Sequence, residues 1–349
     1  MKRRRLLKKA ISASLAIIIA VAAFSTMSYA ASGKWSGIAE GDVLVKDTVT
    51  RITDGVTEHE VITNNEKGTD QRIDYLCEVK PSDSLKAVAG YGNMDATKWS
   101  LTRTTDHAKA YEKKHPGETV VAAINADFFN MANGAPMGAL VMEGEKYHDA
   151  NGRWYFGVTK DNKPVISNDS DLSNLQMAVG GDQVLVRDGK TVTESNEYGS
   201  IRYSRTAIGI KKDGSIVTFV TYGHKPPISN GRTYKEIGEM LSKEGCVTAL
   251  ALDGGGSSTY AGRPEGTDKL VVRNTPGDGA ERAVSSSVMF VSTKEKTGVF
   301  DHAALTPNDE LYTPNSTVKV SAQGVDNAGF PMDLPEGVKY TLAEQNKEL

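Results

Sequence analysis

Cysteine is scarce in this chain of 349 residues, which contains two, Cys77 and Cys246. Two cysteines cannot build the disulfide framework of a small secreted scaffold, and neither has the CxxC or CxxxH spacing of a structural zinc site. Both lie in apolar segments that resemble strands. Two buried free thiols and one long-range disulfide are therefore both compatible with the sequence.

The chain also lacks a hydrophobic run long enough to span a bilayer. Its most apolar stretch is residues 10–24, whereas a transmembrane helix needs about 20 residues. Basic residues precede this stretch, and Ser28-Tyr29-Ala30 follows it with the small residues of a signal-peptidase site. We predict a signal peptide over residues 1–30 and a secreted or cell-wall-associated protein; an uncleaved anchor is the alternative.

Positive charge is in short supply. The chain has a formal net charge of −3, and cleavage after Ala30 would remove six basic and no acidic residues, leaving −9. Such an acidic chain disfavours nucleic acid as a partner. The mature chain is long enough for one large domain and a smaller one, and no membrane span is expected after cleavage.

Short alternating segments separated by turn residues predict most of the structure. Residues 207–222 form a hairpin pattern around Asp213-Gly214. Helices are expected at 106–115 and at 234–244, the second with a capping box from Thr233 and Glu236. The fold class predicted is α+β, with a mixed, largely antiparallel sheet core and a few helices over residues 31–295. We expect the isolated histidines to lie at the surface: His107, His115 and His148.

The last part of the chain, residues 296–349, has a different character. It contains alternating segments such as STVKVSAQGV, separated by turns with proline and asparagine. The pattern resembles the opening strands of an immunoglobulin-like module, which normally takes about 100 residues. We predict an incomplete, β-rich, Ig-like segment; a β-rich tail packed on the main domain is the alternative.

One loop is unusually rich in glycine. Residues 249–262 read ALALDGGGSSTYAG, in which an expected strand leads into Asp253, three glycines and two serines. A phosphate-binding P-loop would need a following Lys-Ser/Thr pair and a helix, and neither is present. A plain turn is the simpler interpretation. Three glycines favour close approach of backbone N–H groups and hydroxyls to an anionic oxygen. The residues expected to do so are Gly254, Gly255, Gly256, Ser257 and Ser258.

Ordered blocks over residues 120–292 resemble the phosphodiester glycosidase family. The blocks are VVAAINADFFN at 120–130 with Pro-Met-Gly at 136–138, RTAIG at 205–209, Ser-Asn-Gly at 229–231, DGGGSS at 253–258, and Glu-Arg at 281–282 before the strand SSSVMFVS. Each block is weak alone, but their order is specific. Ala251 stands where the family usually has Asn, and Tyr222-Gly223-His224 replaces Asp-Gly-Arg, so substrate contacts there are expected to differ.

The resemblance implies cleavage of a sugar C1–O bond whose oxygen belongs to a phosphodiester. The leaving group is a stable anion, so charge stabilisation matters more than protonation. Arg205 and Arg282 suit phosphate binding. Asp253 is the first choice for the catalytic carboxylate, with turn capping as the plainer role, and Glu281 is the second, with a surface ion pair as the alternative. Sugar or phosphate contacts are expected from Asn125, Asp127, Thr206, His224 and the glycine loop.

Two other functions fit the same residues. The departures from the family pattern suit a non-catalytic carbohydrate-binding or envelope glycopolymer assembly protein, and the acidic residues suit a metal-dependent phosphodiesterase. No cofactor is expected. A structural calcium ion could use the oxygen ligands of Asp127, Asn130 and Asp253 if their loops converge. The favoured substrate is a glycosyl phosphodiester or a cell-wall glycopolymer.

Overall fold

The computed structural model describes residues 16–19, 35–192, 196–306, 317, 319–337 and 340–343, with the side chains of 16–19 and 340–343 left aside. Most of the predicted signal peptide, residues 1–30, lies outside these ranges. Within the described part of the chain, no helix combines the length and apolarity needed to cross a membrane.

An eight-stranded sheet, antiparallel at every pairing, is the largest element. The hairpin predicted at 207–222 is confirmed as its strands β15 and β16. In spatial order the strands are β14 (Lys190–Thr191), β13 (Val184–Arg187), β17 (Cys246–Ala251), β15 (Arg205–Lys211), β16 (Ile216–Tyr222), β4 (Arg72–Val79), β3 (Val56–Asn65) and β2 (Asp42–Thr53).

Two five-stranded sheets and a short ribbon complete the main domain. One sheet contains β19 (Val271–Val272), β18 (Tyr260–Gly262), β7 (Thr119–Asn125), β21 (Ser286–Ser292) and β5 (Leu85–Tyr91). The other contains β11 (Pro164–Ser167), β10 (Tyr155–Thr159), β12 (Leu175–Gly180), β8 (Leu140–Met142) and β9 (Glu145–His148). The ribbon pairs β6 (Thr102–Arg103) with β20 (Ala283–Val284).

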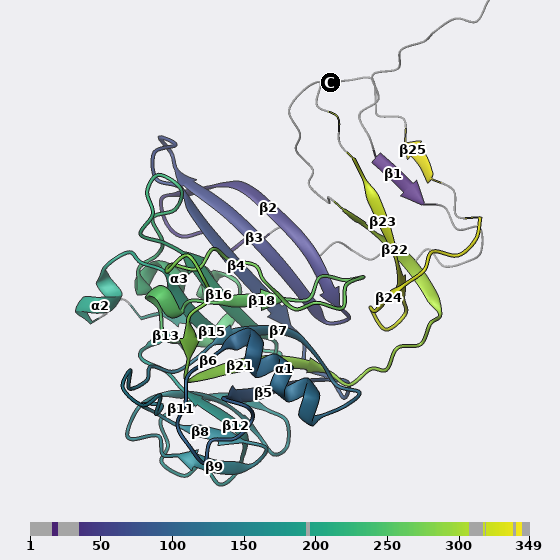
Figure 1. Cartoon of the computed structure of the whole chain (residues 1–349). Coiled ribbons are helices and arrows are strands. Elements are labelled where there is room, and N and C mark those ends of the chain that lie inside the picture. Colours follow the sequence, from purple (N-terminus) through teal and green to yellow (C-terminus); the bar gives the residue numbers. More distant parts are fainter. Residues whose placement is uncertain are drawn as a thin grey trace, which may run out of the picture.

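The core lies between the sheets because side chains alternate along each strand. On β16, Ile216 and Val220 join the cluster shared with β7 and β21, whereas Val217 and Phe219 face the opposite cluster under α3 (Tyr234–Lys243). Helix α1 (Thr104–Lys114) covers β5, β7 and β21 (Figure 1). Both cysteines are buried and free, so the thiol alternative holds.

The two predicted helices are present, and one histidine expectation is wrong. The Thr233 capping box is formed with Glu236, as the sequence predicted. Helix α1 begins at Thr104 instead of Asp106. His107 is fully buried rather than at the surface, because this face of α1 packs on β21, where the His107 Nδ1 lies 3.0 Å from the Ser287 Oγ. His115 and His148 are half-buried.

The C-terminal part forms a three-stranded antiparallel sheet beside the main body (Figure 1): β22 (Phe300–Thr306), β23 (Ser321–Asp326) and β24 (Pro331–Met332). A two-stranded pair, β1 (Ala16–Ile19) with β25 (Tyr340–Ala343), lies near it. The His302 Nε2 lies 2.9 Å from a Glu265 carboxylate oxygen and so ties β22 to the main domain. The described strands confirm β structure here without a second sheet of an immunoglobulin sandwich.

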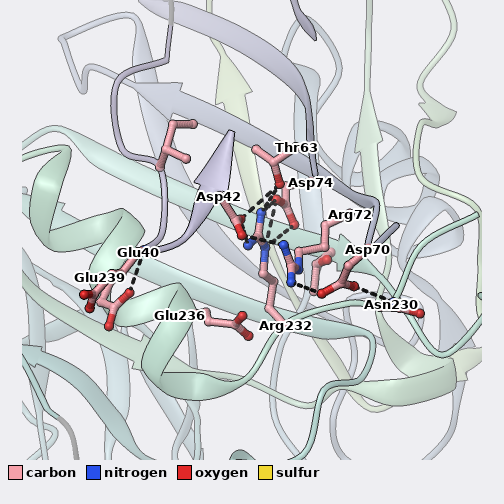
Figure 2. Close-up of polar contacts among 12 residues, drawn as sticks. Glu40, Asp42, Thr63, Asp70, Arg72, Asp74, Asn230, Arg232, Glu236 and Glu239 are labelled. Atoms are coloured by element: carbon pink, nitrogen blue, oxygen red, sulfur yellow. Dashed lines mark hydrogen bonds and ion pairs between the residues drawn. The ribbon is translucent and has the colours of Figure 1, made fainter. Parts of the chain in front are cut away.

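A buried ion-pair network joins the far strands of the large sheet to the segment before α3 (Figure 2). The Arg232 guanidinium donates to Asp74 at 2.6 Å, to Asp42, and to the Thr63 hydroxyl at 2.7 Å. Arg72 bridges Asp42 and Asp70. The Arg232 backbone also pairs with the Tyr203 backbone, with N–H···O distances of 3.2 and 3.3 Å. The network therefore fixes the segment that leads into β15.

Candidate active site

The ends of β7, β15 and β17 meet at one edge of the domain, and Asn125 joins them. The Asn125 Nδ2 donates to the Asp253 carbonyl at 2.7 Å, and its Oδ1 accepts from the Thr206 hydroxyl at 2.8 Å and the Thr259 N–H at 3.0 Å. The Asp253 N–H donates to the Ala126 carbonyl at 2.8 Å. Asn125 and Thr206, expected to contact substrate, are fully buried and engaged with the scaffold instead.

Asp253 is the second residue after β17 and is 9% exposed. Burial raises the pKa of Asp253 to about 6, although a hydrogen bond with Ser257 and the positive charge of Arg282 oppose this rise. The carboxyl group is therefore mostly ionised at neutral pH while remaining shielded from water. A buried carboxylate at a strand end is suited to stabilise positive charge on a sugar ring or to activate a water molecule.

Asp127 lies just beyond the end of β7 and is 1% exposed. Burial raises its pKa to about 7, the charge of Asp253 adds to the rise, and the Gly138 N–H, which donates to its Oδ2 at 2.6 Å, opposes it. Gly180 packs so tightly that an added Cβ would lie 2.4 Å from the same oxygen. Asp127 thus lies within electrostatic range of Asp253, but it is enclosed rather than open to a sugar.

The glycine loop uses most of its N–H groups within the protein. The Gly255 N–H donates to the Ser204 carbonyl at 2.8 Å, and the Ser257 and Ser258 N–H groups close the 3₁₀ turn η1 (Gly255–Ser257). This differs from the expected row of free donors. At Gly256, an added Cβ would lie 2.1 Å from the Arg282 Nη2. The loop therefore serves close packing of an arginine more than direct cradling of an anion by its backbone.

Arg282 lies beside the glycine loop, whereas Glu281 contacts the first turn of α1. Arg282, with its side chain 35% exposed, donates to Asp278 at 2.7 Å and lies 3.5 Å from the Ser257 hydroxyl. Both Glu281 oxygens instead accept from Thr105, from its N–H at 2.9 Å and its hydroxyl at 2.6 Å. Because Arg103, the N-cap residue of α1, gives no side-chain cap, Glu281 takes over this function. Its carboxylate is engaged in helix capping.

Arg205 is 1% exposed, and no carboxylate among the described residues pairs with it. Its Nη2 donates to the carbonyl groups of Tyr198 and Ile201, and its guanidinium lies 3.8 Å from the centre of the Tyr198 ring and 4.9 Å from that of Tyr234. Its Nε and Nη1 are buried without a hydrogen-bond partner. Such a cation is incomplete until an anion approaches it.

Several residues of this site were missed by sequence reasoning. Tyr198 is 37% exposed, and its ring contacts that of Phe128 at 6.1 Å between centres. The Arg153 guanidinium lies over the Phe128 ring, 5.7 Å from its centre, and its charge opposes the rise in the pKa of Asp127. Asp182 accepts from the Tyr234 hydroxyl at 3.0 Å. None of these lies in a recognisable motif, so no local signal in the sequence marked them.

His224, expected to contact substrate, lies beside the glycine loop. It is exposed, its ring centre is 5.0 Å from that of Tyr203, and its backbone has a positive φ of 61°. Together with Gly255 and Gly256 it lines a cavity of about 100 Å³. The structure thus brings His224, the glycine loop, Asp253, Arg205 and Arg282 into one neighbourhood.

Asn130, one of the three residues suggested for a calcium ion, takes part in its own turn. The Asn130 Oδ1 accepts the Ala132 N–H at 2.9 Å within its own turn. Over the described residues, no group of three or more His, Cys, Asp or Glu side chains could hold a metal ion. The other two suggested ligands, Asp127 and Asp253, are close enough for the charge of Asp253 to raise the pKa of Asp127.

Known proteins are similar to this chain in sequence. The phosphodiester glycosidase model matches residues 118–291. The SPbeta prophage-derived uncharacterized protein YomE of Bacillus subtilis is 31% identical over 179 residues, which are 47% of this chain and 27% of that protein. The mouse N-acetylglucosamine-1-phosphodiester alpha-N-acetylglucosaminidase is 24% identical over 217 residues, which are 50% of this chain and 40% of the enzyme. The match therefore spans less than half the length of either relative.

Solved structures show the same fold. The catalytic domain of zebrafish N-acetylglucosamine-1-phosphodiester alpha-N-acetylglucosaminidase, auto-inhibited by its pro-peptide, superimposes with a TM-score of 0.55 at 20% identity, over 71% of this chain and 88% of that one. A hypothetical protein from Synechocystis gives a TM-score of 0.54 at 15% identity, over 71% of this chain and 64% of that one. The sequence blocks, the matching family model and this shared fold agree that the chain belongs to the phosphodiester glycosidase family.

Proposed function

We propose that the protein is an exported hydrolase that cleaves the C1–O bond of a sugar phosphodiester and releases the free sugar and a phosphomonoester. The observation that carries this proposal is a buried carboxylate, Asp253, placed beside two guanidinium groups, one of which lacks any acidic partner among the described residues. Membership of the family supports glycosidic cleavage, and the activity of the curated relatives supports a phosphodiester as the substrate.

The two arginines are assigned different tasks. Arg282 is partly exposed and contacts the Ser257 hydroxyl, so it binds the phosphate directly. Arg205 is covered by Tyr198 and adds a buried positive charge beneath the loop. Its Nε and Nη1 are buried without a hydrogen-bond partner, and no acidic side chain among the described residues cancels its charge. Both charges favour the departing phosphomonoester dianion over the diester monoanion, which lowers the barrier for cleavage.

Asp253 is assigned the carboxylate chemistry. As the C1–O bond breaks, the electron pair leaves with the phosphate oxygen, and positive charge develops on the sugar ring. The ionised Asp253 stabilises that charge or removes a proton from the attacking water molecule. The phosphate leaving group needs little protonation, so no second acid is assigned to this step: Glu281 caps α1, Asp127 is enclosed, and Asp278 is paired with Arg282.

Incubation with a synthetic sugar-1-phosphodiester tests this function. Free sugar together with a phosphomonoester is the expected result. Sugar-1-phosphate would instead indicate P–O cleavage and overturn the proposal in favour of a phosphodiesterase, and a parallel reaction with a chelator would show whether that activity requires a metal. Binding without any product would favour a carbohydrate-binding protein of envelope glycopolymers. Fractionation of the native host tests export, since a protein retained inside the cell contradicts it.

A further inference from the structure

We propose that the cavity beside the glycine loop is the subsite for the leaving group and that it selects an aglycone bearing a second anionic group, such as a polyol phosphate. This inference rests on the proposed function, because it concerns the part of the substrate beyond the scissile phosphate. It names the class of leaving group, which the family assignment leaves open.

Three segments enclose the cavity. Residues 203–204 form one wall, the turn 223–225 forms another, and residues 277–278 lie across Gly255 and Gly256. Its volume of about 100 Å³ is well above the roughly 10–15 Å³ that a single water molecule needs. This space accommodates a phosphate or a short polyol segment. The rest of a longer aglycone would extend into solvent past the exposed turn.

The charge of the cavity favours an anion. The Lys225 side chain is exposed, and no carboxylate among the described residues forms an ion pair with it. Asp278, the acidic residue of the lining, is already paired with Arg282 at 2.7 Å. The cavity therefore has an uncompensated ammonium group in a chain whose formal net charge is −3. A local positive charge on an acidic protein attracts and orients an anionic ligand.

Arg282 connects this cavity to the reacting bond. Its positive charge acts on Asp253 on one side, and its ion pair with Asp278 reaches the cavity lining on the other. A phosphodiester held at Arg282 therefore has one ester arm toward Asp253 and the other toward the cavity. The sugar takes the first arm and the aglycone the second. The Tyr203 and His224 rings, whose centres are 5.0 Å apart and whose planes are tilted by 43°, provide aromatic surface for the carbon atoms of a polyol.

Two substrates with the same sugar and scissile phosphodiester test the proposal, one with a methyl aglycone and one with a phosphorylated glycerol aglycone. The variant is Lys225→Gln, and the matched control is Lys212→Gln, an exposed lysine at the opposite end of the β15–β16 hairpin. We expect Lys225→Gln to lower kcat/KM for the phosphorylated substrate about tenfold. The methyl substrate should be unaffected, and Lys212→Gln should change neither rate.

Equal losses on both substrates, or no preference of the wild-type protein for the phosphorylated aglycone, would overturn the subsite. Failure of the proposed hydrolase function can be distinguished from failure of the subsite, because the wild-type protein would then hydrolyse neither substrate. In that case calorimetric titration with glycerol 1,3-bisphosphate decides. Binding that weakens about tenfold in Lys225→Gln supports the anion site. The absence of binding, or equal affinity in both proteins, excludes it.

Discussion

Two arginines of this protein are buried to a similar degree but have different partners for their positive charge. Arg232 is fully buried, and carboxylates of Asp42 and Asp74 together with the Thr63 hydroxyl surround it. Arg205 is buried almost as completely, yet it is held by two carbonyl oxygens and by tyrosine rings, with two of its nitrogens left without partners. Arg232 is therefore an arginine that stabilises the scaffold, whereas Arg205 has donors and charge left to bind an anion.

The physical basis is the cost of removing a charge from water. A buried guanidinium matched by carboxylates is neutralised, and removing it would leave acids unpaired. Aromatic faces and carbonyl groups stabilise a cation without cancelling its charge. Arg205 therefore still projects a positive potential that favours an incoming phosphate. The comparison predicts that loss of Arg232 impairs folding, whereas loss of Arg205 impairs chemistry.

Replacement of Arg232 by Ala should have the largest effect on stability. We expect the free energy of unfolding to fall by about 3–5 kcal/mol, because Asp74 would remain buried without a counter-charge and Asp42 would keep only its ion pair with Arg72. Denaturant titration measures the change. The exposed ion pair of Lys109 with Asp106, 2.8 Å long, provides a control, since Lys109→Ala should cost less than about 1 kcal/mol. A loss below about 1 kcal/mol in Arg232→Ala would contradict the role of Arg232 in stabilising the fold.

Replacement of Arg205 by Ala should lower turnover of a sugar-1-phosphodiester at least about a hundredfold, through loss of positive charge under the phosphate. Arg205→Met, which keeps much of the side-chain volume among the tyrosines, should lose the same activity while melting close to the wild-type protein. Steady-state kinetics and thermal melts test both variants. Near-normal turnover in folded Arg205→Met would assign this residue to the scaffold as well.

Asp253 is the acidic residue of the site, beside Arg205 and Arg282. Asp253→Ala is expected to reduce turnover at least about a hundredfold with little change in substrate binding. In the wild-type protein, activity should rise with pH through the pKa of about 6, because the ionised form of Asp253 is the active one. A pH–rate profile of kcat/KM tests this sign. A rate that falls with rising pH across this range would argue for a protonated Asp253.

The smallest expected effect concerns Asp127, a buried acid without the full pairing of the Arg232 network. Its pKa of about 7 in the folded protein exceeds the ordinary value of 3.8, so its contribution to stability is present at low pH and lost as pH rises through about 7. From pH 5 to pH 8, wild-type stability should fall by about 2 kcal/mol relative to Asp127→Asn. Denaturant midpoints across this range provide the measurement, and parallel pH dependence in both proteins would contradict it.

Local patterns in the sequence predicted the elements that local contacts stabilise. The β15–β16 hairpin and the Thr233–Glu236 capping box are both confirmed, since turn residues and caps act within a few positions of the chain. The start of α1 was misplaced because its cap comes from Glu281, far along the sequence. The sequence does not reveal such a cap until the strands are assembled.

The site was predicted in part for the same reason. Asp253, Arg282 and His224 were found through their motifs and do lie around the glycine loop. Arg153 and Tyr198 were missed because their roles come from packing against Phe128, which no spacing encodes. The sequence motifs also could not show that Asn125 and Thr206 are engaged in joining strands.

The contact between Gly256 and Arg282 ties together two distant positions of the gene. A single methyl group at residue 256 would occupy the space of the Arg282 guanidinium and of the Asp278 carboxylate, 2.1 and 2.4 Å from the nearest atom of each. Any side chain at residue 256 would therefore displace the Arg282 guanidinium from its place beside the loop. Descendants of this chain that keep the arginine in this place should keep the third glycine as well, whereas the glycine can outlast the arginine.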